Sequence, residues 1–264
     1  MAENKPADTV PNLGFKDKEK ALETIKALEG RDPDYQKLAI KGLIGRANRV
    51  LTITKAEDKL KNIKDALSVF DDWLKNFEKL NLSKENLAYL PMTTVKVFKS
   101  LGKHYNIDNS KFIKAYEKTA EGDYKKLRTI ESNKDEPTWD IVRNTNLKKL
   151  LKELNSKDNV PYWDDDGLPS KEHVELILWA YSPEATKLKK SLSSLEEKVK
   201  KLVGESGDED DESGKDSSKE SDENKQNEKE EKKASKRKSD GKKSGSPEKK
   251  KKPASSSSSG SDDD

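Results

Sequence analysis

The sequence lacks cysteine and has only two histidines, His104 and His173, among 264 residues. Without cysteine the chain forms no disulfide, no zinc–thiolate site, no iron–sulfur cluster and no cysteine nucleophile. Two histidines are too few for a multi-histidine metal centre. The glycine-rich motifs that cradle phosphates in nucleotide-binding enzymes are also missing. We therefore expect no catalytic residue, no metal ligand and no cofactor.

Long apolar runs are missing as well. No stretch approaches the roughly 18 apolar residues of a membrane-spanning helix, and the first residues lack the apolar segment of a secretory signal peptide. Hydrophobic residues make up 30% of the chain and charged residues 40%, whereas an average soluble domain has roughly 45–50% and 25%. The sequence predicts no membrane contact, and it is too polar as a whole to bury one large core.

The composition changes abruptly at Gly204. From there to Asp264, 18 acidic and 15 basic residues occur without a single Leu, Ile, Val, Phe, Tyr or Trp. Such a segment cannot bury enough apolar surface to offset the roughly 1–2 kcal/mol per residue that ordering costs. We predict a disordered tail over 204–264, a foldable body over 13–203 and a flexible N-terminal arm over 1–12. Residues 1–203 carry 39 basic and 33 acidic side chains, so the overall charge of +3 hides a basic body and an acidic tail.

The apolar spacing of the body is helical. The clearest example is the segment 55–77, whose apolar residues recur at steps of three and four: Leu60, Ile63, Leu67, Phe70, Leu74 and Phe77. No segment is convincingly strand-like. We predict an all-α fold, with a compact body of about eight helices whose short linkers favour antiparallel neighbours, followed by the disordered charged tail. The long gap at 123–137 is a candidate point of subdivision.

Local signals mark several helix boundaries. Asp32 and Pro33 are typical of an N-cap and a first helical position, and Thr54 with Glu57 has the spacing of a capping box. The remaining predicted helices cover 15–29, 93–105, 110–121, 138–154, 171–181 and a segment from 182 onward, with a shorter turn over 84–89.

Two features bear on how the helices pack. Gly42 and Gly45 lie inside a predicted helix, where each costs up to ~1 kcal/mol relative to alanine, so we expect another helix to approach closely there. A leucine seam near the end of the body spans only about two heptads, which favours packing on the body over a coiled-coil dimer. Its members are Leu188, Leu192, Leu195, Val199 and Leu202.

The loop 160–169, VPYWDDDGLP, is the most distinctive short string. Its adjacent aspartates, Asp164 to Asp166, offer oxygen ligands for a divalent cation, and an enzyme that uses this loop is one hypothesis. The ligand spacing of a calcium-binding loop is absent, however, and Asp–Gly is typical of a turn that Trp163 anchors on the core. His173 follows the predicted N-cap Ser170, but no nucleophile-elbow motif accompanies it. A turn and a structural histidine are therefore favoured.

Basic residues form two clusters that we treat as candidate nucleic-acid contacts. Acidic residues interleave nearly everywhere in the body, which favours an ordinary solvated helix surface with ion pairs one turn apart. DNA or RNA binding by the body is therefore the alternative hypothesis and not the first one. The candidate residues are Lys41, Arg46 and Arg49 in one cluster and Lys148, Lys149 and Lys152 in the other.

Aromatic residues are concentrated in two segments, 139–144 and 178–181, and in the loop at 162–163. Aromatic side chains at helical spacing usually belong to a core, but they also form grooves for partner peptides. The candidate groove residues are Trp139, Trp163, Trp179 and Tyr181.

The tail contains the sharpest signal. A basic triplet is separated by ten residues from a run of four lysines and Pro253. This spacing resembles a bipartite nuclear localisation signal, which implies an importin-type receptor as a partner. The signal residues are Lys236, Arg237, Lys238, Lys249, Lys250, Lys251 and Lys252.

Serines in the tail are candidate phosphorylation sites. Ser246-Pro247 resembles a site for proline-directed kinases of the cyclin-dependent type. Four other serines, each with an acidic residue three positions later, resemble substrates of acid-directed casein kinases: Ser206, Ser213, Ser217 and Ser261. Each phosphate adds about −1.5 to −2 charges. The composition of 204–264 also resembles tails of nucleolar and chromatin-associated proteins.

The sequence therefore favours a non-enzymatic nuclear protein, located in the nucleus, with the nucleolus as an alternative. Its helical body is expected to bind an unidentified nuclear protein, and its tail to supply import, regulation and weak contact with nucleic acid. A chromatin, transcription or RNA-processing context fits such a tail. The alternatives are a body that itself binds DNA or RNA and, with less support, an enzyme that uses the loop 160–169.

Overall fold

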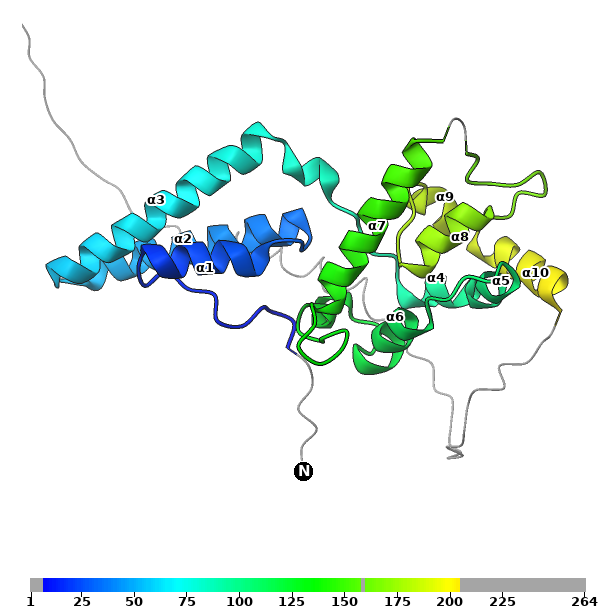
Figure 1. Cartoon of the computed structure of the whole chain (residues 1–264), viewed down its shortest axis with the longest axis horizontal. Helices are drawn as coiled ribbons and strands as arrows, with labels where there is room; N and C mark the ends of the chain where they lie inside the picture. The colour runs from blue at the N-terminus through cyan, green and yellow to red at the C-terminus, as the bar shows by residue number, and fades with distance from the viewer. Residues whose placement is uncertain (1–6, 158–159, 205–264) are drawn as a thin grey trace, which may run out of the picture. The chain divides into compact units, whose positions relative to one another are not determined.

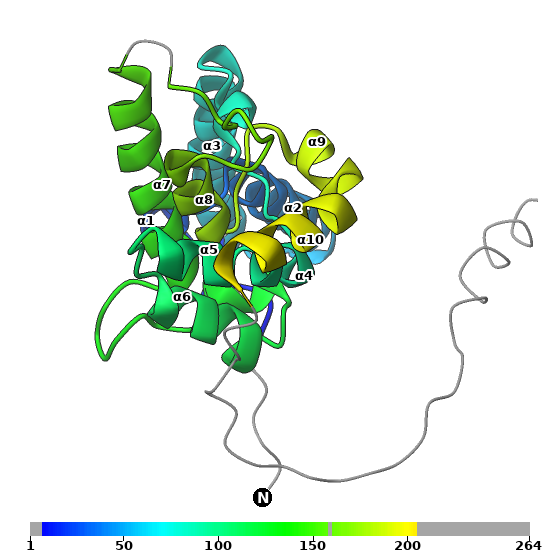
Figure 2. The same ribbon diagram turned by 90° about the vertical axis from the view of Figure 1, so that its right-hand side faces the viewer.

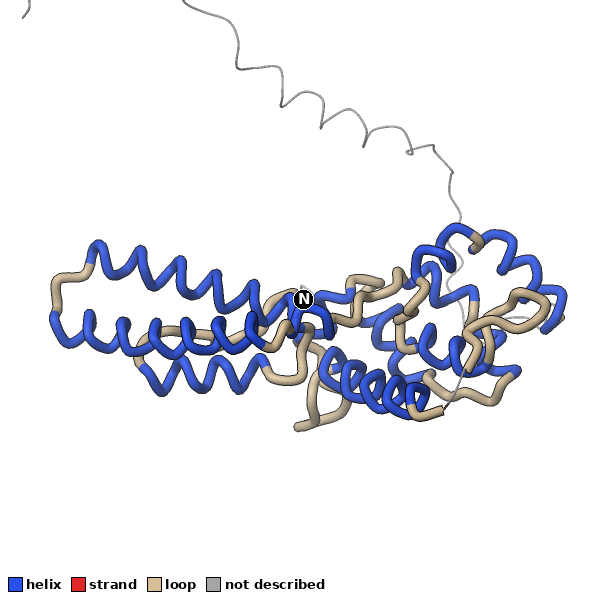
Figure 3. The backbone as a smooth tube through the Cα atoms, turned by 90° about the horizontal axis from the view of Figure 1, so that it is seen from above, coloured by secondary structure: helices blue, strands red, loops and turns tan. Residues whose placement is uncertain are grey.

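The computed structural model of the chain describes residues 7–157 and 160–204. These residues form ten α-helices and no strand (Figures 1 and 3), which confirms the all-α prediction. The helices are α1 (Lys18–Leu28), α2 (Pro33–Ile53), α3 (Glu57–Lys79), α4 (Met92–Val97), α5 (Lys99–His104), α6 (Ser110–Lys114), α7 (Trp139–Asn155), α8 (Lys171–Leu178), α9 (Ala185–Lys190) and α10 (Leu192–Val203). Shorter turns are η1 (Leu82–Glu85), η2 (Ala115–Thr119) and η3 (Tyr124–Arg128).

Helices α1, α2 and α3 lie side by side, with α3 in contact with both of the others (Figures 1 and 3). The apolar stripe predicted for α3 is the face that it buries, with Phe70 fully buried and Phe77 almost so. The shared core of these three helices consists of Ala21, Leu28, Tyr35, Ile40, Leu43, Ala66 and Phe70.

Two of the predicted boundary signals turn out differently. The helix α2 begins at Pro33 after Asp32, as predicted, but the Asp32 side chain does not cap it. The capping box of Thr54 and Glu57 does not form, because Thr54 still belongs to the end of α2, where its N–H donates to the carbonyl of Val50. Ala56 takes the N-cap position of α3 without any side-chain cap.

The remaining helices, α4 to α10, are all shorter than α2 and α3 and share a second core. The single helix predicted over 93–105 is divided at Phe98, whose backbone leaves the helical conformation while its side chain is fully buried. The helix predicted over 110–121 passes from α6 into the wider π turn η2. These two interruptions make several short helices where fewer long ones were expected.

The leucine seam near the end of the body packs onto the chain itself. Helix α10 contacts α4 and α5 (Figure 2), and a break at Ser191 separates it from α9. Leu188, Leu195 and Val199 are buried in the second core, whereas Leu202 is 49% exposed.

The first core ends within α3 and the second begins at Leu90, and residues on both sides of 123–137 belong to the second core. The segment 123–137 instead contains η3, whose Leu127 is fully buried in the second core. The part of the predicted arm that the structure describes lies against this body: the N–H of Val10 donates to the hydroxyl of Tyr35 at 2.9 Å. None of the helices in the described ranges combines the length and the apolar character of a membrane-spanning helix.

Candidate interaction surfaces

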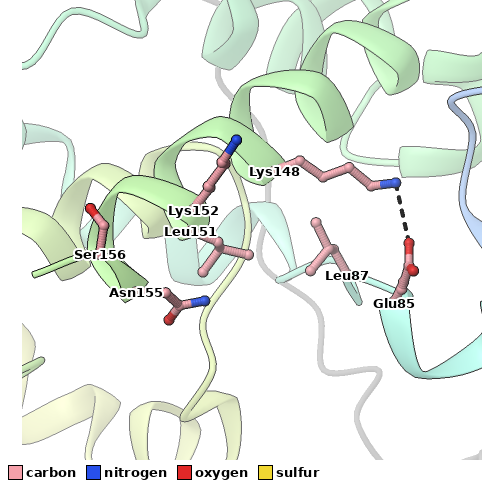
Figure 4. Close-up of a pocket in the computed structure, with 7 residues that line it drawn as sticks. All are labelled: Glu85, Leu87, Lys148, Leu151, Lys152, Asn155 and Ser156. Carbon is pink, nitrogen blue, oxygen red and sulfur yellow. Dashed lines mark hydrogen bonds and ion pairs between the residues drawn. The ribbon is translucent and has the colours of Figure 1, made fainter.

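An open groove lies between α7 and the segment that follows η1. It has a volume of about 530 Å³. Figure 4 shows Leu151 of α7 on one side and Leu87 on the other, with Lys148 reaching Glu85. We call this the α7 groove; it is lined by Glu85, Leu87, Lys148, Leu151, Lys152, Asn155 and Ser156.

The α7 groove combines an apolar floor with a cationic rim. Leu87 and Leu151 are half-buried against a small core of Leu147, Leu154 and Leu176. The ion pair between Lys148 Nζ and Glu85 is long, at 3.4 Å, and both side chains are more than half exposed, so it contributes little to stability. Its opening therefore costs little when another carboxylate competes for Lys148.

The second cationic cluster lies on α2. One side of α2 is exposed along most of its length. Exposed residues recur there at steps of four, three, four and four: Leu38, Gly42, Gly45, Arg49 and Ile53. Leu38 and Ile53 keep 69% and 76% of their surface exposed. We call this the α2 outer face; with the flanking cations it comprises Leu38, Lys41, Gly42, Gly45, Arg46, Arg49 and Ile53.

No helix packs on Gly42 or Gly45. A Cβ atom at either position would have nothing within 4 Å, so the prediction of a close helix contact there is wrong within the described part of the chain. Each glycine costs roughly 1 kcal/mol of helix stability relative to alanine. The fold itself offers no compensation for that cost.

The six basic residues proposed for nucleic-acid contact do not gather in one place. Lys41, Arg46 and Arg49 lie on α2, whereas Lys148 and Lys152 line the α7 groove. Lys149 is exposed on α7 but does not line the groove. The contacts between the start of α2 and α7 run through Asp32, which meets Arg143 and Asn144 and none of the six basic candidates.

The four aromatic candidates do not line a common groove either. Trp139 is buried, and its ring and that of Trp179 both pack on Phe112, at 5.9 and 5.0 Å between centroids. Tyr181 packs on the small core beneath α7 and α8. Trp163 lines a separate shallow depression of about 590 Å³ beside α9.

The aspartate loop is a closed turn. The N–H of Asp164 donates to the carbonyl of Leu168 at 2.8 Å, and the N–H of Leu168 donates back to the Asp164 carboxylate at 2.7 Å. Gly167 adopts a positive φ of 73° at the turn, and Asp165 and Asp166 are exposed. In residues 7–157 and 160–204, no three acidic or histidine side chains gather as a metal site would require. Trp163 holds the loop through its indole N–H, which donates to Glu184 at 2.7 Å.

His173 is fully buried next to this loop. Its Nδ1 lies 2.8 Å from the carbonyl of Tyr162 and its Nε2 lies 2.8 Å from the hydroxyl of Ser182. A carbonyl only accepts, so Nδ1 carries the proton and Nε2 accepts from Ser182. Burial lowers the pKa of His173, because an apolar environment disfavours the charged imidazole. The third group that orients this pair is a backbone carbonyl and not a carboxylate, and Ser182 is itself buried.

A buried polar network joins the first three helices to α7, and sequence reasoning missed it. The Arg31 guanidinium contacts the Asp140 carboxylate at 2.8 Å, with 8% and 1% of the two side chains exposed. Asn144 donates to the carbonyl of Gly30 at 3.0 Å and to Asp32 at 3.3 Å. The sequence did contain a signal for this network in α7. The polar positions 140, 143 and 144 share the helical spacing of the apolar Leu147, which places them on the same, buried face.

Arg143 is the most deeply buried charge of this network. It is fully buried and donates to the carbonyls of Trp179 and Ala180, at 2.9 and 3.1 Å. The face of its guanidinium stacks on the Tyr89 ring at 3.5 Å. Burial lowers the pKa of Arg143 and raises that of Asp32, and the attraction between the two opposes both changes. The network therefore fixes how α7 meets the start of α2.

The sites predicted in the tail lie outside the described residues. These are the candidate import signal, Lys236 to Lys238 and Lys249 to Lys252, and the candidate phosphorylation sites Ser206, Ser213, Ser217, Ser246 and Ser261. Comparison with known proteins finds no matching family model, no similar curated protein and no similar solved structure.

Proposed function

We propose that this chain is a non-enzymatic nuclear protein whose helical body binds another protein and whose tail directs import. The α7 groove is the observation that supports the proposal. A floor of two leucines supplies apolar area that a partner side chain can bury, and the rim lysines supply charge for orientation. The chromatin, transcription or RNA-processing context rests on the composition of the tail.

The chemistry of the groove defines the partner segment. An apolar anchor residue fits between Leu87 and Leu151, and an acidic residue beside it displaces Glu85 from Lys148. Lys152 is exposed and offers a second contact for a carboxylate. A short segment with acidic residues around one or two large apolar residues is therefore the expected ligand.

Charge reversal in the groove tests this proposal. The double variant Lys148→Glu, Lys152→Glu changes the rim without touching the buried core. Lys149→Glu is the control, because it reverses one charge on the same helix outside the groove, and Lys148→Glu alone matches it in charge. Tagged full-length chains are used to capture proteins from nuclear extract after nuclease treatment, and captured proteins are quantified by mass spectrometry. We expect a set of proteins that the wild type and Lys149→Glu retain and the double variant loses. Equal capture by all three chains would contradict a role for the groove.

Import is tested separately in the tail. Alanine at Lys249 to Lys252 is expected to move a fluorescent fusion from the nucleus to the cytoplasm, because the second basic cluster of the signal is removed. Alanine at Lys242 and Lys243, two lysines between the clusters, is the control. Unchanged nuclear accumulation of the first variant would show that this run is not the import signal.

The alternative, a body that binds DNA or RNA, has less support. A phosphate backbone is neutralised by cations that converge on one surface, whereas the six candidates are divided between α2 and α7.

A further inference from the structure

The α2 outer face has a one-sided charge. Between Tyr35 and Ala56 the chain has five basic residues and no acidic one. Three of these cations, Lys41, Arg46 and Arg49, are exposed on the same side of α2. Across the described residues none of the three has an ion-pair partner. The face is therefore complementary in charge to an acidic surface.

Apolar side chains mark both ends of the same face. Leu38 and Ile53 are the two most exposed large hydrophobic residues among those described, at 69% and 76%. Ile53 lies fifteen helical positions after Leu38, which corresponds to about 22 Å along the axis. Between them the backbone is bare at Gly42 and Gly45. The face thus has two apolar contacts at its ends and a shallow trough at the two glycines. Arg49 lies within this row, and Lys41 and Arg46 lie on either side of it.

We propose that the α2 outer face docks an amphipathic helix of another protein, with acidic residues flanking its apolar stripe. A helix laid along α2 places apolar side chains on Leu38 and Ile53, and the absence of side chains at the two glycines allows the backbones to approach. Acidic residues beside the stripe then reach Lys41, Arg46 and Arg49. This surface is independent of the α7 groove, since it lies on a different helix.

The same features disfavour other occupants. A second copy of the chain, packed with its α2 on this α2, would place like charges opposite each other. The segment 204–264 has acidic residues but no large apolar side chain to cover Leu38 or Ile53. A nucleic acid would satisfy the cations, yet it would leave these two side chains facing a phosphate backbone.

A designed peptide tests the proposal without knowledge of the natural partner. The probe is a fluorescein-labelled 21-residue helix with leucines at positions i, i+3, i+4 and i+7 and glutamates beside them. The control peptide has the same composition in scrambled order, so that both have equal attraction to the lysines of the tail. Binding to the full-length chain is followed by fluorescence anisotropy. We expect the amphipathic peptide to bind at least tenfold more tightly than the scrambled one.

Variants then locate the site on α2. Gly42→Leu with Gly45→Leu fills the trough in open space and is expected to weaken peptide binding at least tenfold without lowering the melting temperature. Leu38→Glu is expected to have a similar effect, with Leu22→Glu on α1 as the control for an exposed leucine. Arg46→Glu with Arg49→Glu should weaken binding and reduce its dependence on salt.

Three results would overturn the proposal. The first is equal binding of the amphipathic and scrambled peptides. The second is tight binding of a 20-base-pair DNA duplex that the charge variant loses while Leu38→Glu and the glycine variant retain it. The third is self-association, measured by light scattering, that disappears in the same variants that fail to bind peptide.

Discussion

The two groups of helices, α1 to α3 and α4 to α10, are constructed in different ways. Helices α2 and α3 have 21 and 23 residues, whereas the longest helix of the second group, α7, has 17. The second group depends on turns with unusual backbone conformations; its non-glycine residues with positive φ are Asn106, Glu121, Asp135 and Ala180. Long helices with one apolar stripe can leave a whole face free for contact, whereas short helices use most of their surface to hold one another.

The glycines inside helices also differ between the two groups of helices. In α5, Gly102 lies against α8, and a Cβ atom there would come within 2.4 Å of Leu178. In α2, Gly42 and Gly45 have open space above them. One glycine is required by packing inside the fold, whereas the other two have no packing partner inside it. The following experiments test this distinction, beginning with the residue that holds the two groups together.

Replacement of Arg143 by alanine should have the largest effect. It removes the donor for two buried carbonyls and leaves Asp32 in a buried site without its opposite charge. Removal of one partner of a buried pair typically costs about 3–5 kcal/mol, and we expect a loss of that size in the free energy of unfolding. Urea denaturation, followed by tryptophan fluorescence, measures it.

The control variant keeps the positive charge of the Arg143 side chain but not its planar shape. Arg143→Lys retains one positive charge without the planar fork that reaches several acceptors, so its loss should be intermediate. Trp73 lies in the first group of helices and the other three tryptophans in the second. A Trp73→Phe background therefore reports the second group alone. A loss below about 1 kcal/mol, the usual size for a single exposed interaction, would show that the network does not hold the groups together.

The features that could be predicted from the sequence are those with a local cause. The stripe of α3 and the start of α2 at Pro33 follow from neighbouring residues, because a helix repeats every 3.6 residues. The break at Phe98 does not, since it depends on burial of that ring in a core built from distant segments. Likewise, Arg143 looks like a surface residue until Trp179 and Ala180 are placed against it.

The candidate site divides in the same way. Lys148, Lys149 and Lys152 form a basic cluster that the sequence shows directly, because the three lie within five residues. Leu87, which forms the opposite side of the α7 groove, lies some 60 residues earlier in the chain, and no local pattern connects it to them. The open space at Gly42 and Gly45 was equally hidden, because a helix-interior glycine has the same sequence signal whether or not a neighbour packs on it.

Gly102→Ala should be destabilising by about 1–3 kcal/mol, the usual cost of overpacking a core. The added methyl group displaces Leu178, which is 2% exposed and cannot move into solvent. Chemical denaturation measures the loss. A smaller residue at the clashing position should relieve it, so Gly102→Ala combined with Leu178→Ala should cost less than the sum of the two single changes. Strict additivity would mean that the α5–α8 contact adjusts freely.

His173 should make stability depend on pH. Burial lowers its pKa, whereas in the unfolded chain a histidine takes up a proton below about pH 6.5. Because only the unfolded state gains this proton in the window just below pH 6.5, the free energy of unfolding should fall as the pH is lowered through it. Near the ring, Glu184 opposes this effect and Lys187 strengthens it.

Histidine replacements separate the contribution of His173 to the pH dependence of stability from the contributions of other groups. His173→Gln removes the titration and should flatten the pH dependence between pH 7.5 and 5, at a cost of about 1 kcal/mol at neutral pH for each imperfectly replaced hydrogen bond. His104→Gln is the control, since His104 is the only other histidine and is exposed. Thermal unfolding at a series of pH values measures both. An unchanged slope in His173→Gln would show that other groups set the pH dependence.

Gly42→Ala and Gly45→Ala should have the smallest effects, and of the opposite sign to Gly102→Ala. Alanine restricts the unfolded chain and favours the helix, so each change should stabilise the fold by about 0.5–1 kcal/mol. The open space over both positions leaves no clash to oppose that gain. Chemical denaturation of the three alanine variants compares them directly. Destabilisation by Gly42→Ala would mean that this face is already covered within the chain and is not free for a partner. Stabilisation would mean that the natural sequence retains two glycines that its own fold does not require, as expected for a surface whose role lies outside the fold.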